Sequence, residues 1–142
     1  MFEFTEILKP RKSTHFIILH HSEVSSPHTA ADIHRWHQNK GWAGIGYHFF
    51  IDKSGKIHVG RPIYCVGAHT YGHNHESIGI CLEGDFNKEQ PTEAQEKATV
   101  MLLYRLGHLY PDAKICRHSD FNKSKNCPGK FFPFEKLKQQ IS

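Results

Sequence analysis

Residues 15–22 read HFIILHHS, an apolar run that ends in two adjacent histidines and a serine. This composition is typical of a strand, and because both alternating sets of side chains in residues 16–19 are apolar, we expect a strand buried on both faces. Adjacent residues of a strand point to opposite faces, so His20 and His21 must face opposite sides of the sheet. The pattern predicts a buried strand that ends in a polar pair, and it leaves open which histidine is functional.

Strand-like and helix-like segments alternate along the rest of the chain. Thr29 and Thr92 are suitable helix N-caps, Gln95 completes a capping box with Thr92, and Pro111 follows the second helix. The expected elements are a strand over residues 15–20, a helix over 30–41, a hairpin of strands 47–52 and 56–60, a strand over 77–84, a helix over 91–111, a strand over 113–118 and a helix over 133–141. This order predicts an α/β fold, a single domain with a mixed central sheet flanked by helices.

The length and composition also bound the class of protein. The chain has 142 residues, of which 38% are hydrophobic and 23% charged, so we expect one globular domain over residues 1–142, with residues 1–13 as a peripheral segment. No run approaches the roughly 18 apolar residues of a membrane span, so membrane insertion is not expected. The first residues, MFEFTEILKPRK, do not resemble a secretory signal peptide, and we therefore expect synthesis in the cytoplasm.

The net charge of +4 could favour an anionic partner. The basic residues are scattered, however, and the chain has no zinc-finger, helix-turn-helix or RNA-binding signature. Nucleic acid is therefore not an expected partner.

Histidines and a cysteine near the ends of two expected strands could form a metal site. A catalytic zinc ion typically has three protein ligands and one open position. His20 or His21 ends the first strand, His118 ends a later strand, and Cys127 follows in the turn NCPG. The four cysteines form no CxxC pair, which excludes the usual zinc ribbon. The spacing alone is equally compatible with histidines that only form hydrogen bonds.

Five motifs, taken together and in order, resemble a known family. They are FIILHHS at 16–22, IHRWHQNKGWAGIGYHFFIDKSGKIHVGRP at 33–62, VGAHTYGHNHESIGICLEGDF at 66–86, TEAQ at 92–95 and CRHSDFNKSKNCPG at 116–129. This set resembles the zinc-dependent type-2 N-acetylmuramoyl-L-alanine amidases, which include small phage lysozyme-type enzymes and the peptidoglycan recognition proteins. The matching pieces cover roughly residues 14–134.

The resemblance implies a zinc-containing cleft in which His20, His118 and Cys127 hold one zinc ion per chain. The implied reaction is hydrolysis of the amide bond between N-acetylmuramic acid and L-alanine in peptidoglycan or a muropeptide. The cleft tyrosine of the family falls on Tyr47, which would orient the attacking water, donate to the oxyanion or protonate the leaving amine. The family lysine falls on Lys125, whose positive charge would stabilise the oxyanion.

Three more residues are expected to bind substrate. His69 and Asn74 match the cleft loop of the family, and Arg61 could pair with a stem-peptide carboxylate through its planar guanidinium. Some bacterial relatives carry a glutamate at the position of Cys81, and we assign no catalytic role to the nearby Glu83.

Two other functions stay open at this point. One is a non-catalytic peptidoglycan-binding module, because recognition-type relatives can keep the groove without the zinc cysteine. The other is a cysteine hydrolase in which Cys127 is the nucleophile and His118 the base. The biological role also has two interpretations, a phage or prophage lysis enzyme and an enzyme that recycles wall fragments, and no protein partner is indicated.

Overall fold

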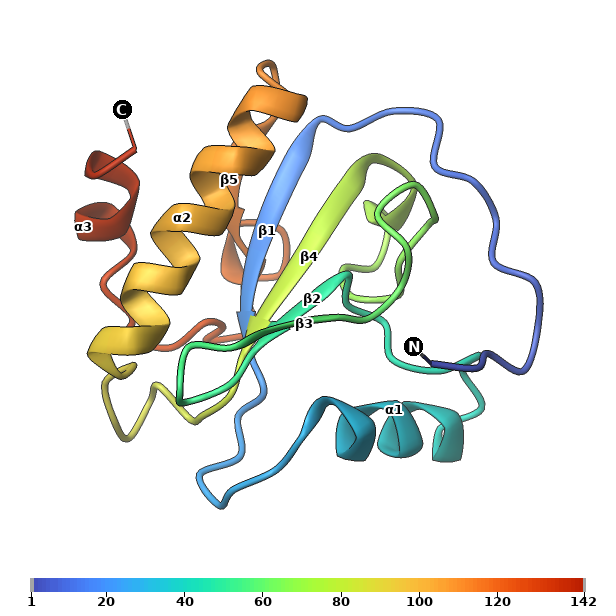
Figure 1. Ribbon diagram of the computed structural model, residues 1–142, viewed down its shortest axis with the longest axis horizontal. Helices are drawn as coiled ribbons and strands as arrows, with labels where there is room; N and C mark the ends of the chain where they lie inside the picture. The colour runs from blue at the N-terminus through green and yellow to red at the C-terminus, as the bar shows by residue number, and fades with distance from the viewer. Residues whose placement is uncertain (1, 142) are drawn as a thin grey trace.

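A five-stranded mixed sheet forms the centre of the molecule in the computed structural model, which describes residues 2–141 (Figure 1). The end residues of the expected domain, 1 and 142, lie outside the described residues. The strands are β1 (Phe16–His21), β2 (Phe49–Ile51), β3 (Ile57–Val59), β4 (Ser77–Leu82) and β5 (Lys114–Arg117), in the order β3-β2-β4-β1-β5. β1 is parallel to both β4 and β5, whereas β3 is antiparallel to β2. The prediction of a mixed sheet is confirmed.

Helices cover both faces of this sheet. α2 (Glu93–Leu109) and α3 (Phe134–Gln139) pack together on one face, and α1 (Ala30–Asn39) lies on the other (Figure 1). Two short 3-10 helices lie in the loops: η1 (Asn74–Glu76) directly precedes β4, and η2 (His118–Asp120) directly follows β5. All expected elements are present, and their ends differ from the expected ones by a few residues.

Local signals explain where the helices begin and end. Thr29 caps α1 and Thr92 caps α2, and each hydroxyl accepts the backbone N–H three residues on while the side chain at that position bonds back. Gly41 follows the end of α1 with a φ of 91°, which only glycine adopts without strain. The predicted caps are therefore confirmed.

Two apolar cores lie on opposite faces of the sheet, because successive residues of a strand alternate. Ile17 and Leu19 pack with α2 and α3 in the first core. Ile33 of α1 packs with Phe50 and Cys81 in the second core. In β1 every residue after Phe16 is buried, including Ile18 on the face opposite to Ile17 and Leu19, so the strand is buried on both faces as its composition predicts.

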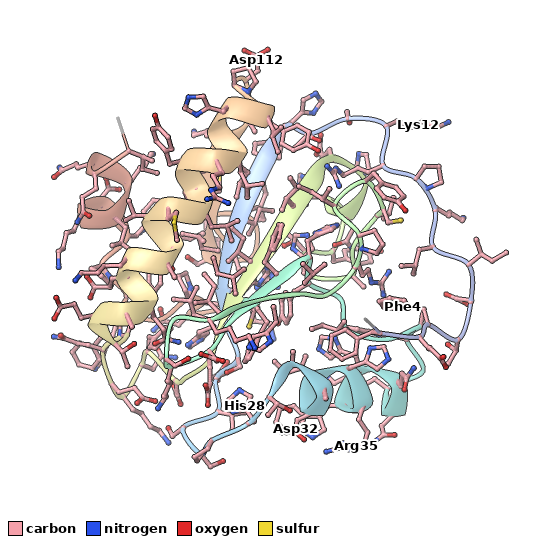
Figure 2. All side chains as sticks on the ribbon, viewed as in Figure 1. Phe4, Lys12, His28, Asp32, Arg35 and Asp112 are labelled. Carbon is pink, nitrogen blue, oxygen red and sulfur yellow. The ribbon has the colours of Figure 1, made fainter. Side chains whose placement is uncertain are left out.

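The N-terminal segment, residues 2–13, runs along the outside from α1 to the start of β1 (Figure 1). Phe4 lies beside α1, with its ring centroid 5.3 Å from that of His34, and Lys12 points outward (Figure 2). Backbone hydrogen bonds join the segment to the loop after β3, including Val66 N to Lys9 O at 2.8 Å. Within residues 2–141, no helix is both long and apolar enough to cross a membrane.

Candidate metal centre

The ends of β1 and β5 bring together the first two predicted metal ligands. In the parallel register of these strands, Leu19 pairs with Arg117, so His20 and His118 follow side by side. Their ring centroids are 4.6 Å apart. Parallel neighbouring strands deliver the residues at their carboxyl ends to the same edge of a sheet, which explains how two distant histidines meet.

The loop after β5 returns Cys127 to the same point. The backbone N–H of Ser119 donates to Cys127 O at 3.0 Å and closes the loop. Cys127 Sγ lies 3.8 Å from His20 Nδ1, and the backbone N–H of His21 donates to this sulfur at 3.4 Å. The donor atoms of His20, His118 and Cys127 all lie within 4.8 Å of one another.

The two adjacent histidines of β1 have different surroundings. His20 faces the metal-ligand cluster, whereas the side chain of His21 is on the opposite face. His21 Nδ1 accepts the N–H of Phe86 at 3.0 Å, and its ring lies against that of Phe86. His21 therefore contributes its backbone N–H to Cys127 and keeps its imidazole in the core.

Burial keeps all three donors neutral in the absence of a metal. Burial lowers the pKa of His20 well below its ordinary value, and the neighbouring His69 and His118 lower it further. Burial also lowers the pKa of His118, with a further contribution from the charge of Lys125. The pKa of the Cys127 thiol is raised to about 12, mainly by burial.

This donor set fits a zinc ion. Two imidazole nitrogens and one sulfur are the ligands that zinc prefers, and three protein ligands leave a position open for water or substrate. A bound dication would favour the thiolate of Cys127, which opposes the effect of burial, and the neutral imidazoles of His20 and His118, which burial already favours.

Tyr47 lies beside the metal-ligand cluster, just before β2. Its ring centroid is 5.1 Å from that of His20 and 5.6 Å from that of His37. Burial raises the pKa of the Tyr47 phenol well above its ordinary value, and the nearby Cys81 and Cys127 raise it further. The phenol is therefore a proton-bearing hydrogen-bond donor at neutral pH, and its predicted catalytic role stays a prediction.

Lys125 lies exposed in the loop that carries Cys127. Its charge acts on the metal-ligand cluster, since it lowers the pKa of His118 and opposes the rise in the pKa of Cys127. Its role in stabilising an oxyanion stays a prediction.

The three predicted substrate-binding residues are engaged within the protein. Asn74 Oδ1 accepts the backbone N–H groups of His69 and Thr70, both at 2.8 Å. Arg61 is 7% exposed, and its guanidinium donates to two backbone carbonyls, Ile45 O at 2.8 Å and Val66 O at 3.2 Å. These contacts favour structural roles for Asn74 and Arg61, and their binding of substrate stays a prediction.

His69 contacts a predicted ligand directly. Its Nδ1 lies 2.9 Å from His20 Nε2, on the side of the His20 ring opposite to Cys127. Three further residues near the cluster had not been expected from the motifs. Thr70 and Ser77 both bond to His69, and His37 packs against Tyr47. For His37 a signal existed, because it shares the buried face of α1 with Ile33, four residues earlier.

Comparison with known proteins agrees with this arrangement. Residues 10–130 match the sequence profile of the family described as N-acetylmuramoyl-L-alanine amidase. The endolysin of Enterobacteria phage T3 is 38% identical over 88 residues, which cover 61% of this chain and 58% of the endolysin. The chain thus spans less than two thirds of the length of that relative.

Solved structures match almost the entire chain. N-acetylmuramoyl-L-alanine amidase LysC from Clostridium intestinale URNW superposes with a TM-score of 0.94 at 35% identity, over 99% of this chain and 93% of that one. Peptidoglycan recognition protein-LE, in complex with tracheal cytotoxin, superposes with a TM-score of 0.86 at 27% identity, over 96% of this chain and 87% of that one. With its sheet, its ligand cluster and the family match over residues 10–130, this chain belongs to the N-acetylmuramoyl-L-alanine amidase family.

Proposed function

We propose that this protein is a zinc-dependent N-acetylmuramoyl-L-alanine amidase, which hydrolyses the amide bond between N-acetylmuramic acid and L-alanine of peptidoglycan. The observation that carries the proposal is the cluster of His20, His118 and Cys127, with donor atoms within 4.8 Å of one another, in a chain of this family. The names of the relatives support cell-wall peptidoglycan or a muropeptide as substrate. Synthesis in the cytoplasm stays a prediction.

The side chains around the metal-ligand cluster suit amide hydrolysis. His20, His118 and Cys127 would hold a zinc ion, which would supply a Lewis acid for the carbonyl and lower the pKa of a water toward about 7. Tyr47 keeps its proton and can donate it to the developing oxyanion or to the leaving amine. Lys125 adds a positive charge at the same site, which favours the negatively charged transition state.

The cysteine hydrolase is less well supported. A nucleophilic cysteine needs a thiolate, and catalytic cysteines accordingly have lowered pKa values. The pKa of Cys127 is instead raised to about 12 by burial. This thiol suits a metal ligand, because a bound cation displaces its proton.

A chelator experiment tests the proposed function. The purified protein should contain one zinc ion per chain and release new L-alanine amino termini from purified peptidoglycan. Activity should disappear with chelator and return with added zinc, because the proposed chemistry needs a metal at His20, His118 and Cys127. Activity that persists without metal would contradict the proposal, and zinc-loaded protein that binds the wall without releasing amino termini would indicate a binding module.

The Tyr47→Phe variant tests the role of the phenol. It should bind zinc like the wild type but turn over more slowly by about 100-fold, the usual effect of removing one donor to an oxyanion. Metal content and the rate of amino-terminus release are the measurements. An unchanged rate would show that Tyr47 is a packing residue.

A further inference from the structure

A chain of buried hydrogen bonds leads from His20 into the protein, away from Cys127. His20 Nε2 lies 2.9 Å from His69 Nδ1, and His69 Nε2 lies 3.2 Å from Ser77 Oγ. Ser77 Oγ in turn donates to His73 O at 2.8 Å. His20, His69 and Ser77 are 1%, 8% and 0% exposed, so water does not compete for these bonds.

The carbonyl of His73, at the end of this series of hydrogen bonds, sets the donor and the acceptor of each bond in the series. A carbonyl oxygen only accepts, so the single hydroxyl proton of Ser77 is used on His73 O. Ser77 Oγ can then only accept from His69, which places the proton of the neutral His69 ring on Nε2. His69 Nδ1 is therefore an acceptor, and the proton it receives is that of His20 Nε2. The lone pair of His20 is left on Nδ1, the atom that faces Cys127.

The reverse direction would disable the ligand. If His69 carried its proton on Nδ1, His20 Nε2 would have to accept it, and the neutral His20 would carry its proton on Nδ1. That proton would point into the cluster where a cation must bind. The tautomer of a ligating histidine is generally set by the bond that its other nitrogen makes.

The surrounding residues hold the His69 ring in this position. A Cβ at Gly79 would lie 2.5 Å from His69 Cγ, and a Cβ at Gly67 would lie 2.8 Å from His69 Cδ2. The ring therefore occupies space that two glycines leave open. Asn74 holds the backbone of His69, and Thr70 Oγ1 lies 3.0 Å from His69 Nδ1 and 3.4 Å from His20 Nε2, beside the bond between the two rings.

We infer that His69 is a positioning residue, which fixes His20 in the tautomer with its proton on Nε2 through hydrogen bonds that end on the carbonyl of His73. This inference rests on the proposed role of His20 as a metal ligand. It differs from the predicted role of His69 in substrate binding, because the Nδ1 and Nε2 atoms of its ring are both used within the protein.

The tautomer can be read directly in the metal-free protein by ¹⁵N NMR of the imidazole nitrogens. In the wild type we expect the proton of His20 on Nε2 and that of His69 on Nε2. In Ser77→Ala the hydroxyl that accepts from His69 is gone, and we expect a mixture of tautomers at both rings. A proton on His20 Nδ1 in the wild type would overturn the inference, and so would unchanged tautomers in Ser77→Ala. This measurement needs no metal, so it is independent of the proposed function.

Zinc affinity, measured by competition with a chromophoric chelator, gives the second readout. His69→Leu removes the acceptor while keeping the ring space filled, and zinc affinity should fall by about 10–100-fold. His69→Asn offers an amide oxygen near the position of Nδ1 and should recover most of that loss. His75→Asn, at an exposed residue of the same loop, is the matched control and should bind zinc like the wild type. Equal affinities in His69→Leu and His69→Asn would overturn the inference, whereas a wild type that binds no zinc would instead contradict the proposed function.

Discussion

The Cys127→Ala variant is expected to lose amidase activity and most of its zinc affinity. Cys127 supplies the only sulfur of the ligand cluster, and its Sγ sits 3.8 Å from His20 Nδ1. Mutation of a residue that only hydrogen-bonds to a metal ligand typically lowers metal affinity or activity by about 10–100-fold. Removal of a ligand itself should therefore lower zinc affinity by more than about 100-fold. The measurements are zinc content and the release of L-alanine amino termini from purified wall.

Thermal unfolding gives an independent readout of the same change. A metal that binds only the folded state stabilises it by about 4 kcal/mol when present at about 1,000 times its dissociation constant. Added zinc should therefore raise the melting temperature of the wild type and have little effect on Cys127→Ala. Cys116→Ala is the matched control, because Cys116 is buried in β5 without belonging to the ligand cluster, and its response to zinc should match the wild type. A fully active Cys127→Ala protein would contradict the proposed metal site.

The metal-free protein is expected to lose stability as the pH falls from about 6.5 toward 4. Burial lowers the pKa of both His37 and His48 to about 4 in the folded protein. In the unfolded chain a histidine has a pKa of about 6.5. Between these two pKa values the unfolded chain binds more protons than the folded protein. The contribution of the neutral histidines to the free energy of unfolding is therefore complete above about pH 6.5 and decreases as the pH falls. Each histidine should remove about 3 kcal/mol from the free energy of unfolding over this interval.

Urea unfolding in the presence of chelator at several pH values between 7.5 and 4.5 measures this effect. His48→Asn keeps an acceptor for the N–H of Gly79, which bonds to His48 Nδ1 at 3.0 Å, and lacks the titrating ring. The pH dependence should therefore be smaller in His48→Asn than in the wild type. His108→Asn, at an exposed position of α2, should keep the wild-type dependence. A free energy of unfolding that is constant between about pH 7.5 and 4.5 would contradict the expectation.

Most of the fold could be predicted because its signals are local. Thr29 and Thr92 cap their helices through side chains three residues away, and the apolar run of β1 lies within one short segment. Such signals do not depend on the rest of the chain. The ends of elements were less well predicted, because the last hydrogen bonds of a strand depend on how far its neighbours extend.

These local patterns could not predict the order of the strands in the sheet. β4 lies between β2 and β1, and β5 lies at the edge beside β1. Both placements depend on contacts between segments that are distant in sequence. The motif resemblance implied the fold, and the structure confirms it.

The sequence by itself determined the types and order of the elements, the family and the kinds of metal donor, because these follow from local composition and from motifs. Composition and alternation could not choose between His20 and His21, because both faces of β1 are apolar. The family resemblance pointed to His20, and the tertiary structure shows that His20 is the one whose ring lies beside His118 and Cys127. It also decided the partners of Arg61 and His69, which had been expected to meet substrate. A buried polar group must bond to whatever the fold places beside it, and for Arg61 and His69 those neighbours are backbone carbonyls and the His20 ring.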